Sequence, residues 1–452
     1  MRPALPLALV LAAAATAAAD PIKEIVVEGN TKTDSNTVRV IAKLEEGQDW
    51  TPDMSDVVRA DLVSSGLFKD VNVFYEPVDG GVRVHLVVKD KHSWVIAPAF
   101  YNQPTNVGGG LGFGENNLLG YNQKLLIYAQ LATGDSFFVA AHQVPHIGGS
   151  RFYSQVDTFL KSARNFEYAS PTEWIGDPPK KVRESRMNYL NLGAKIGVEL
   201  WRGVKLDTRL RAAHVSFPTS HKKLKLAEGA AIEDVTGDPT SDPNHLARPG
   251  IDGWDISNEW ALTIDRRANW YGIQSGHSYK ATFEHALESL GSDFKYWLAG
   301  ISIYGAQRIL ERHNAIIKIN ASYGHNLPFQ QEFTAGGTSQ RGYANNQFRG
   351  DLRVAANLEY SVPLFTIKGL SVRGLGFFDS SYVTFLAHPE DNIQRNYLPG
   401  SNARGLDPFK NSVGVGMRLY LRQIVLPLLG VDFGYGLEAG DTQIYLAIGL
   451  TD

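Results

Sequence analysis

The sequence predicts an α+β domain followed by a transmembrane antiparallel β-barrel of about 16 strands. Three observations lead to this prediction: an N-terminal export signal, a helix-containing pattern confined to residues 20–91, and a two-residue hydrophobic alternation from residue 93 onward. The 452 residues include 44 Lys and Arg against 47 Asp and Glu, and this near balance gives no support for a nucleic-acid partner. The chain has no cysteine, which excludes disulfides, thiolate metal sites and cysteine nucleophiles.

The first 19 residues have the pattern of a secretory signal peptide. Arg2 supplies a positive charge, residues 4–15 form an uninterrupted apolar run, and Ala17-Ala18-Ala19 is a small-residue cleavage site. The run is too short and too rich in alanine to favour an uncleaved membrane anchor. No later window of about 18 apolar residues occurs, so we expect an exported mature chain without a helical membrane span.

Residues 20–91 are predicted to form a small domain with the element order β-α-α-β-β. The pattern indicates a strand at 25–27, a helix over 31–44, a helix from Thr51-Pro52-Asp53 to Gly66, and two strands at 71–75 and 82–88 joined by Asp79-Gly80-Gly81. In the second helix, Thr51 is the expected cap and Pro52 suits the first turn.

From residue 93 onward, apolar residues alternate with charged, polar or small ones. Segments 190–198, 206–211, 352–359 and 443–450 all follow this pattern. A barrel with lipid outside and a wet lumen inside requires one apolar and one polar face on each strand. A soluble β-sandwich also alternates, because its apolar face packs in a core, so the connections have to distinguish the two folds.

The connections between the predicted strands favour the membrane barrel. The strands are about ten residues long, as a tilted membrane strand requires. The long connections, at 164–183, 216–253, 324–350 and 380–409, all fall in one parity class, and the other class holds only tight or modest turns. With residues 20–91 in the periplasm, every long connection is extracellular, which is the rule for outer-membrane barrels. We therefore expect residues 92–452 to form a barrel in the bacterial outer membrane.

Several motifs, taken in order along the chain, resemble one protein family. Residues 20–91 resemble a POTRA (polypeptide-transport-associated) domain, most clearly over 62–71. The barrel resembles the outer-membrane β-barrel assembly and secretion superfamily, also called the bacterial surface antigen family. Gln340-Arg341-Gly342-Tyr343 is similar to its loop-six Arg-Gly-aromatic triplet. Phe377-Phe378-Asp379-Ser380-Ser381 is similar to its Phe-x-Asp-x-Gly strand motif, with Ser381 where glycine is usual.

The resemblance implies that loop six latches onto the barrel wall and that this latch supports stability and activity. Strand parity points Phe377 and Asp379 into the lumen, where Asp379 can form a bidentate pair with Arg341 if the loop enters the barrel. Gly342 allows a folded-back path beside Tyr343. From spacing alone, a solvated loop arginine and an unrelated lumenal aspartate explain these residues, because charged lumenal side chains are common in barrels.

The barrel is expected to close by pairing residues 93–101 with 442–450. The resemblance implies that this seam is weak in assembly proteins and can template a client strand. Pro98 removes a hydrogen-bond donor from the first strand, although a proline near a sheet edge is also an ordinary bulge. Ile444, Leu446 and Ile448 form the apolar face of the last strand. The chain ends in Thr451-Asp452 and so departs from the aromatic ending usual in outer-membrane barrels.

The resemblance implies an outer-membrane assembly or insertion factor, not an enzyme, that folds client β-barrels or translocates polypeptides. The alternative is a dedicated secretion pore of the two-partner type, and a single POTRA domain fits neither group well. A passive porin is a third class, which the POTRA domain argues against. Expected partners are unfolded outer-membrane protein clients or a secreted polypeptide, together with outer-membrane lipid. Periplasmic chaperones or accessory proteins are candidates for further partners.

No catalytic site, cofactor, metal or nucleic acid is expected. Gly134-Asp135-Ser136-Phe137 resembles one block of a hydrolase class, but the partner block with His and Asp is missing at the C-terminus. The glycine-rich segment 108–114 is not followed by a helix that could bind phosphate, so a curved strand explains it better. His142 and His146 are separated by Pro145, which rules out a pair of metal ligands on one helix.

Overall fold

The computed structural model describes residues 20–103, 106–168, 181–218, 248–270, 273–367, 370–397, 409–421 and 427–448. The chain divides into two compact units, Met1–Ser93 with Asn116–Gln123, and Trp94–Glu115 with Lys124–Asp452. The expected signal peptide lies outside the described residues. Among the residues described, no helix is both long and apolar enough to cross a membrane.

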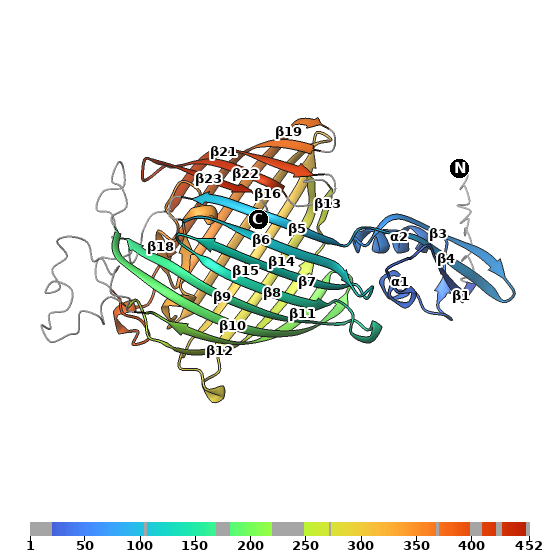
Figure 1. The fold of residues 1–452 in the computed structure, drawn as a ribbon, viewed down its shortest axis with the longest axis horizontal. Coiled ribbons are helices and arrows are strands. Elements are labelled where there is room, and N and C mark those ends of the chain that lie inside the picture. Colours follow the sequence, from blue (N-terminus) through green and yellow to red (C-terminus); the bar gives the residue numbers. More distant parts are fainter. Residues whose placement is uncertain are drawn as a thin grey trace, which may run out of the picture. The chain divides into compact units, whose positions relative to one another are not determined.

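The first unit contains a four-stranded sheet with two helices (Figure 1). Its elements are β1 (Asp20–Glu28), α1 (Ser35–Ala42), β2 (Asp49–Trp50), α2 (Met54–Ser64), β3 (Phe68–Val78) and β4 (Gly81–Asp90). The strand order is β2-β1-β4-β3, with β1 parallel to β4 and β3 antiparallel to β4. The predicted order β-α-α-β-β is confirmed, and the two-residue β2 is added at one edge.

The two helices begin in different ways. The Asp34 side chain caps α1 by accepting a hydrogen bond from the Thr37 backbone N at 3.0 Å. The predicted cap of α2 by Thr51 is wrong, since Asp53 precedes the helix in a helical backbone conformation and no side chain caps it. Instead, the backbone N of Met54 donates to the carbonyl of Thr51 at 3.0 Å, so a tight turn satisfies the first amide.

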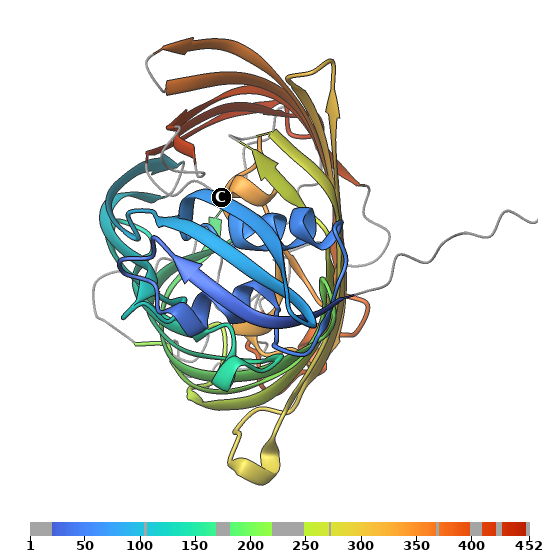
Figure 2. The ribbon, with the colours of Figure 1, turned by 90° about the vertical axis from the view of Figure 1, so that its right-hand side faces the viewer.

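The second unit is a closed antiparallel barrel (Figure 1). The prediction of about 16 strands is confirmed. Short β13 (Ala268–Trp270) adds a pairing on β14. In Figure 2 the long strands are seen nearly end-on and form a curved wall. The long strands in the described residues are β5 (Trp94–Gln103), β6 (Asn106–Leu118), β7 (Gln123–Ala132), β8 (Ser136–Val144), β9 (Phe152–Tyr168), β10 (Lys181–Trp201), β11 (Val204–Ser216), β12 (Gly253–Asp265), β14 (Ile273–Ala286), β15 (Trp297–Ile309), β16 (His313–His325), β19 (Leu352–Ile367), β20 (Leu370–Thr384), β21 (Lys410–Leu421), β22 (Pro427–Gly436) and β23 (Asp441–Ile448).

Side chains alternate in exposure along the barrel strands as the sequence pattern predicts. On β10, Leu192 and Ile196 are 58% and 52% exposed, whereas Asn191 is 4% exposed. The apolar side chains therefore point outward, and the polar ones point into the lumen, as a membrane barrel requires.

Loop six connects β16 to β19 and has structure of its own. Its β17 (Phe333–Ala335) and β18 (Phe348–Gly350) pair as a small antiparallel sheet on either side of the loop tip. The short 3₁₀ turns η3 (Phe329–Gln331) and η4 (Gly337–Ser339) lie before and within the tip. Other short 3₁₀ turns in connections are η1 (Ile147–Gly149), η2 (Glu288–Leu290) and η5 (Pro389–Asp391). Most of the tip is buried, so the loop folds into the barrel.

Candidate functional site

The tip of loop six contacts the inner wall of the barrel at β20. Arg341 donates from Nε to Oδ2 and from Nη2 to Oδ1 of Asp379, both at 2.7 Å. The Arg341 backbone N also donates to Oδ2 at 3.2 Å. Asp379 is 0% exposed and Arg341 is 5% exposed. The pair is therefore bidentate and shielded from water, which strengthens its hydrogen bonds.

Two further carboxylates and one aromatic ring surround Arg341. Its Nη1 lies 2.8 Å from Glu359 Oε1 and 3.6 Å from Asp432 Oδ2. The guanidinium carbon lies 3.5 Å from the centroid of the Phe377 ring. Burial opposes the charged form, but the hydrogen bonds and charge of Asp379, with the nearby Glu359 and Asp432, raise the pKa of Arg341 above its ordinary value. Arg341 is thus held as a permanent cation.

Gly342 lets the backbone of loop six approach β22 closely. Its φ is +95°, and a Cβ at this position would lie 2.6 Å from the backbone N of Gly436 and 2.8 Å from the backbone C of Tyr435. A Cβ on Gly434 would lie 2.6 Å from Gly342 N. Because the facing atoms are backbone, a side chain at either position would have to displace the loop or the strand.

Tyr343 is buried beside Gly342 and fixes the loop to the last strands. Its ring packs edge-on against Phe348, with 5.3 Å between ring centroids. Its hydroxyl lies within hydrogen-bond distance of the Glu438 carboxylate and of the Asn411 carbonyl. Tyr445 of β23 bridges the motif, since its hydroxyl accepts from Gly342 N at 3.1 Å and donates to the Tyr343 carbonyl at 2.9 Å.

The structure therefore brings Arg341, Gly342 and Tyr343 together with Phe377 and Asp379. The sequence assigned no role to Gln340, which is fully buried and donates from Nε2 to the carbonyls of Lys410 and Asp379 at 3.0 and 3.2 Å. The sequence also assigned no role to Glu359, Asp432 and Tyr445. Strand parity could have placed all three in the lumen, but parity does not tell which of many lumenal residues face the loop tip.

The residues named for the seam lie where β23 meets β5. Three register pairs join these strands in the described residues, namely Leu446↔Asn102, Ala447↔Tyr101 and Ile448↔Phe100. Pro98 lies opposite Leu111 of β6 and outside the described pairs with β23. Ile444 is 53% exposed, so it lies on the outward face of β23.

A lumenal cavity of ≈ 590 Å³ extends from the loop-six tip. Arg341, Arg418, Glu359 and Asp432 line it on one side, and Tyr128 and Gln130 line it on another. Arg418 forms a bidentate pair with Asp432, at 2.7 and 2.8 Å. The lining is largely polar, which suits a hydrated lumen. In the part of the chain that is described, no cluster of His, Cys, Asp or Glu is arranged to hold a metal ion.

Comparisons with known proteins agree with the motifs. The family model described as the Omp85 superfamily domain matches residues 117–451. The outer membrane protein assembly factor BamA of Neorickettsia risticii (strain Illinois) is 24% identical over 279 residues, which are 61% of this chain. The match covers 33% of that relative, so the chain spans only about a third of its length.

Solved structures share the fold at low sequence identity. BamA from Haemophilus ducreyi lacking POTRA domains 1–3 is similar with a TM-score of 0.61 and 17% identity, over 95% of this chain and 84% of that one. CdiB from Acinetobacter baumannii is similar with a TM-score of 0.63 and 12% identity, over 96% of this chain and 74% of that one. CdiB from Escherichia coli is similar with a TM-score of 0.57 and 12% identity, over 98% of this chain and 93% of that one. These likenesses show a barrel of the BamA and CdiB type with an N-terminal β/α domain.

Proposed function

Because this chain belongs to the Omp85 superfamily, we propose that it is an outer-membrane protein assembly factor that inserts client β-barrels through its own seam. The chain forms an outer-membrane β-barrel of the BamA and CdiB type. The assembly and transport proteins of this family are non-enzymatic, and the chain is therefore not an enzyme.

The proposal assigns a task to each part of the chain. Residues 1–19 serve as a cleaved signal peptide, and residues 20–91 act as a single periplasmic POTRA domain. This domain offers β3 and β2 as sheet edges to which an unfolded client strand can pair. Residues 92–452 form the barrel, whose long loops face the outside of the cell. The clients are unfolded outer-membrane proteins, helped by periplasmic chaperones or accessory proteins.

The observation that carries the proposal is the seam itself, where β5 and β23, the first and last strands of the barrel, pair with each other. Unlike the other neighbouring long strands of the barrel, these two do not follow one another in the chain, so no turn connects them. Backbone ladder hydrogen bonds close this junction without help from a connecting turn, so it can open without displacing a loop. An opened seam exposes two strand edges within the membrane, and these edges can template a client strand.

The loop-six latch supplies the second part of the proposal. The pair Arg341–Asp379 joins the loop to β20, and Tyr343 and Tyr445 join it to the strands next to the seam. We assign to the latch the task of holding β20–β23 in register while the seam opens. Loss of the latch is then expected to lower assembly activity in a barrel that still folds.

A disulfide across the seam tests the proposal, and the chain has no cysteine of its own. Asn102→Cys with Leu446→Cys places two thiols on facing residues of β5 and β23. Oxidation is expected to stop the assembly of other barrels, and reduction is expected to restore it. The control pair, Val431→Cys with Leu446→Cys, locks β22 to β23 and leaves the seam free. Full assembly with the oxidised seam would overturn the proposed role.

The polar lumenal cavity favours a second candidate, a pore that exports one dedicated partner protein. Export through the lumen does not need the seam, so the oxidised Asn102→Cys, Leu446→Cys variant should still secrete. Outer-membrane barrels and culture-medium proteins are measured side by side. Loss of many unrelated barrels supports the assembly factor, whereas loss of one secreted protein after depletion of this chain supports the pore.

A further inference from the structure

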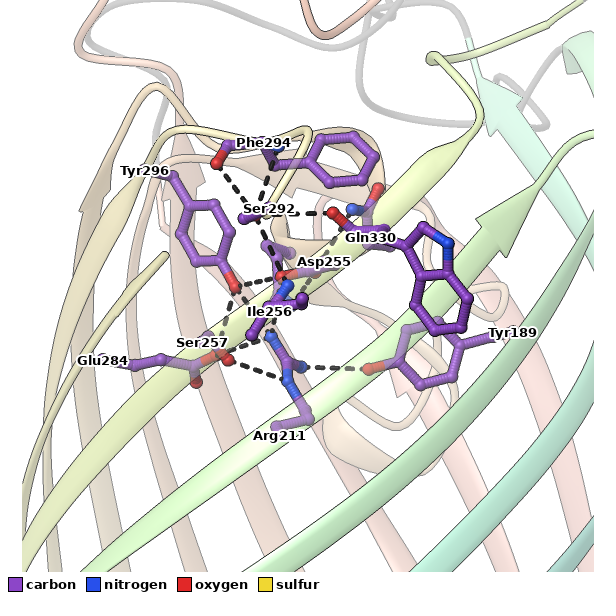
Figure 3. Close-up of polar contacts among 12 residues, drawn as sticks. Tyr189, Arg211, Asp255, Ile256, Ser257, Glu284, Ser292, Phe294, Tyr296 and Gln330 are labelled. Atoms are coloured by element: carbon purple, nitrogen blue, oxygen red, sulfur yellow. Dashed lines mark hydrogen bonds and ion pairs between the residues drawn. The ribbon is translucent and has the colours of Figure 1, made fainter. Parts of the chain in front are cut away.

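A second group of buried polar side chains lies on β11, β12 and β14, on a different part of the barrel wall from Asp379 on β20. Figure 3 shows this group. Arg211 on β11, Asp255 on β12 and Glu284 on β14 project from adjacent strands into the lumen. Arg211 Nη2 lies 2.6 Å from Glu284 Oε1 and 3.2 Å from Asp255 Oδ1. The Tyr296 hydroxyl donates to Asp255 Oδ1 at 2.8 Å. We call these four residues the Asp255 cluster.

The two oxygens of Asp255 face different parts of the molecule. Oδ1 interacts with Arg211 and Tyr296, which belong to the barrel wall and the connection before β15. Oδ2 accepts from Gln331 Nε2 at 2.9 Å and from Gln330 Nε2 at 3.3 Å. Both glutamines belong to η3, at the start of loop six. Asp255 therefore bonds the wall with one oxygen and the loop with the other.

The charge balance of the cluster makes the contact with loop six important. One guanidinium, that of Arg211, faces the two carboxylates of Asp255 and Glu284. Glu284 also accepts from Ser257 Oγ at 2.7 Å, and Arg211 donates from Nη1 to the Tyr189 hydroxyl at 3.0 Å. Asp255 is 0% exposed, so Oδ2 depends on the two glutamine amides. Withdrawal of η3 would leave a buried carboxylate oxygen without them, which is unfavourable.

The position of η3 affects the position of the loop-six tip. Phe329 of η3 packs against Phe217, with 5.8 Å between ring centroids, and under the guanidinium of Arg349, at 3.8 Å. β17 begins two residues after Gln331 and pairs with β18. The small sheet of β17 and β18 therefore connects η3, at the base of loop six, to the tip that carries Arg341. A shift of the base therefore shifts the tip.

We propose that the Asp255 cluster is a second anchor of loop six, a positioning site that sets how deeply Arg341 reaches toward Asp379. Loop six is then held at its base and at its tip by carboxylates on two different parts of the wall. This inference rests on the proposed role of loop six as a latch, and it adds the residues that place the latch.

Disulfide trapping in the purified full-length protein tests the second anchor. Asn345 at the loop tip donates from Nδ2 to Gln103 Oε1 of β5 at 3.3 Å, so Gln103→Cys with Asn345→Cys reports a docked tip. In this background, Asp255→Asn is expected to slow disulfide formation roughly tenfold, because one charge-assisted acceptor of the loop is lost. The matched control is Asp157→Asn on β9. It removes a lumenal carboxylate whose Oδ2 lies 2.6 Å from Nη2 of Arg209 on β11. It should leave the rate unchanged.

A second variant keeps the test decisive if Asp255→Asn fails to fold. Gln330→Leu with Gln331→Leu removes both donors from the loop and leaves the wall intact, and it should slow trapping by a similar factor. Trapping at the control rate in the folded variants would overturn the second anchor. Slow trapping with undiminished client assembly would support the anchor and overturn the latch as part of the proposed function, so the two failures are distinguishable.

Discussion

Arg341 is the cation on which three buried or half-buried carboxylates of the lumen depend. It lies within 3.6 Å of Asp379, Glu359 and Asp432, and only Asp432 also has Arg418 as a bidentate partner. Removing one member of a buried ion pair leaves the other charge without compensation, which costs far more than the pair itself contributes. The residue that holds the loop is therefore also a determinant of barrel stability.

We expect Arg341→Ala to lower the free energy of unfolding by about 3–5 kcal/mol while the barrel still folds. Arg341→Lys should recover part of this loss, because an ammonium keeps the charge but cannot form the bidentate pair. Urea unfolding in detergent measures both variants. Arg164→Ala is the control, since its pair with Glu184 is partly exposed and should contribute at most about 1 kcal/mol. Equal losses in the variant and the control would contradict this account.

Gly342→Ala is expected to undock the loop tip without removing any charge. The new Cβ meets backbone atoms of β22 at 2.6 and 2.8 Å, in addition to the strain of a positive φ. Gly291→Ala is a matched control, since Gly291 has a φ of +92° and no heavy atom within 4 Å of a Cβ. Proteolysis of the folded protein at the loop should accelerate for Gly342→Ala alone. Similar acceleration in both variants would mean that backbone strain, and not the close approach, causes the effect.

At the scale of elements, the segment after β1 wraps around the carboxylate at the end of β4. Asp90 Oδ2 accepts from the backbone N of Thr31, Lys32 and Thr33 at 2.5, 2.7 and 3.3 Å. Burial raises the pKa of Asp90, but these backbone donors and the Thr33 hydroxyl outweigh it and hold the pKa below its usual value. The ionised carboxylate thus ties β1 to β4 beyond their ladder.

The stability that Asp90 contributes is expected to depend on pH. A lowered folded-state pKa means that the contribution is fully present above the unfolded value of about 3.9 and is lost as the pH falls through the folded value. Asp90→Asn should therefore speed hydrogen exchange of the amides around residues 31–33 at pH 7, relative to the unmodified chain at the same pH. The difference should shrink in strongly acidic buffer. A difference that persists there would show that the hydrogen bonds, and not the charge, are responsible.

At the scale of the barrel, buried ion pairs join connections that are far apart in sequence. Arg395 contacts Glu332 of loop six and lies 3.2 Å from Glu167 of β9, while Arg183 and Arg349 pair with the same two carboxylates. All five residues are at most 7% exposed. Arg395 is the cation that connects the two pairs, so it links loop six and the connection after β20 to the wall.

Arg395→Ala is expected to loosen the link between loop six, the connection after β20 and the barrel wall. The ionic conductance of the barrel in planar bilayers should then increase. The two carboxylates keep one arginine each, so the barrel should still fold and the change should appear mainly in the connections. Arg164→Ala again serves as the control, because its pair joins only β9 and β10. Equal conductance in the two variants would show that Arg395 does not hold the lumen closed.

The sequence by itself determined the features that depend on local periodicity. Helical spacing around Val38 and Ile41 predicts a helix, and the two-residue alternation in 190–198 predicts a strand, because burial of one face repeats along each element. The parity of the long connections then favours a membrane barrel over a β-sandwich. Strand parity also pointed Phe377 and Asp379 inward. The cap of α2 was mispredicted, since a backbone turn satisfied the amide that a Thr51 side chain was expected to cap.

Only the tertiary structure decided which lumenal side chains meet the loop. Tyr445 lies 102 residues from Tyr343 in the chain, and Gln331 lies 76 residues from Asp255. These contacts depend on the strand register and on how far loop six enters the barrel, and neither is encoded in the spacing of residues within one strand. Closure of the barrel brings distant strands together around the loop, and this is the physical reason why the sequence could name Arg341 and Asp379 but not the rest of their surroundings.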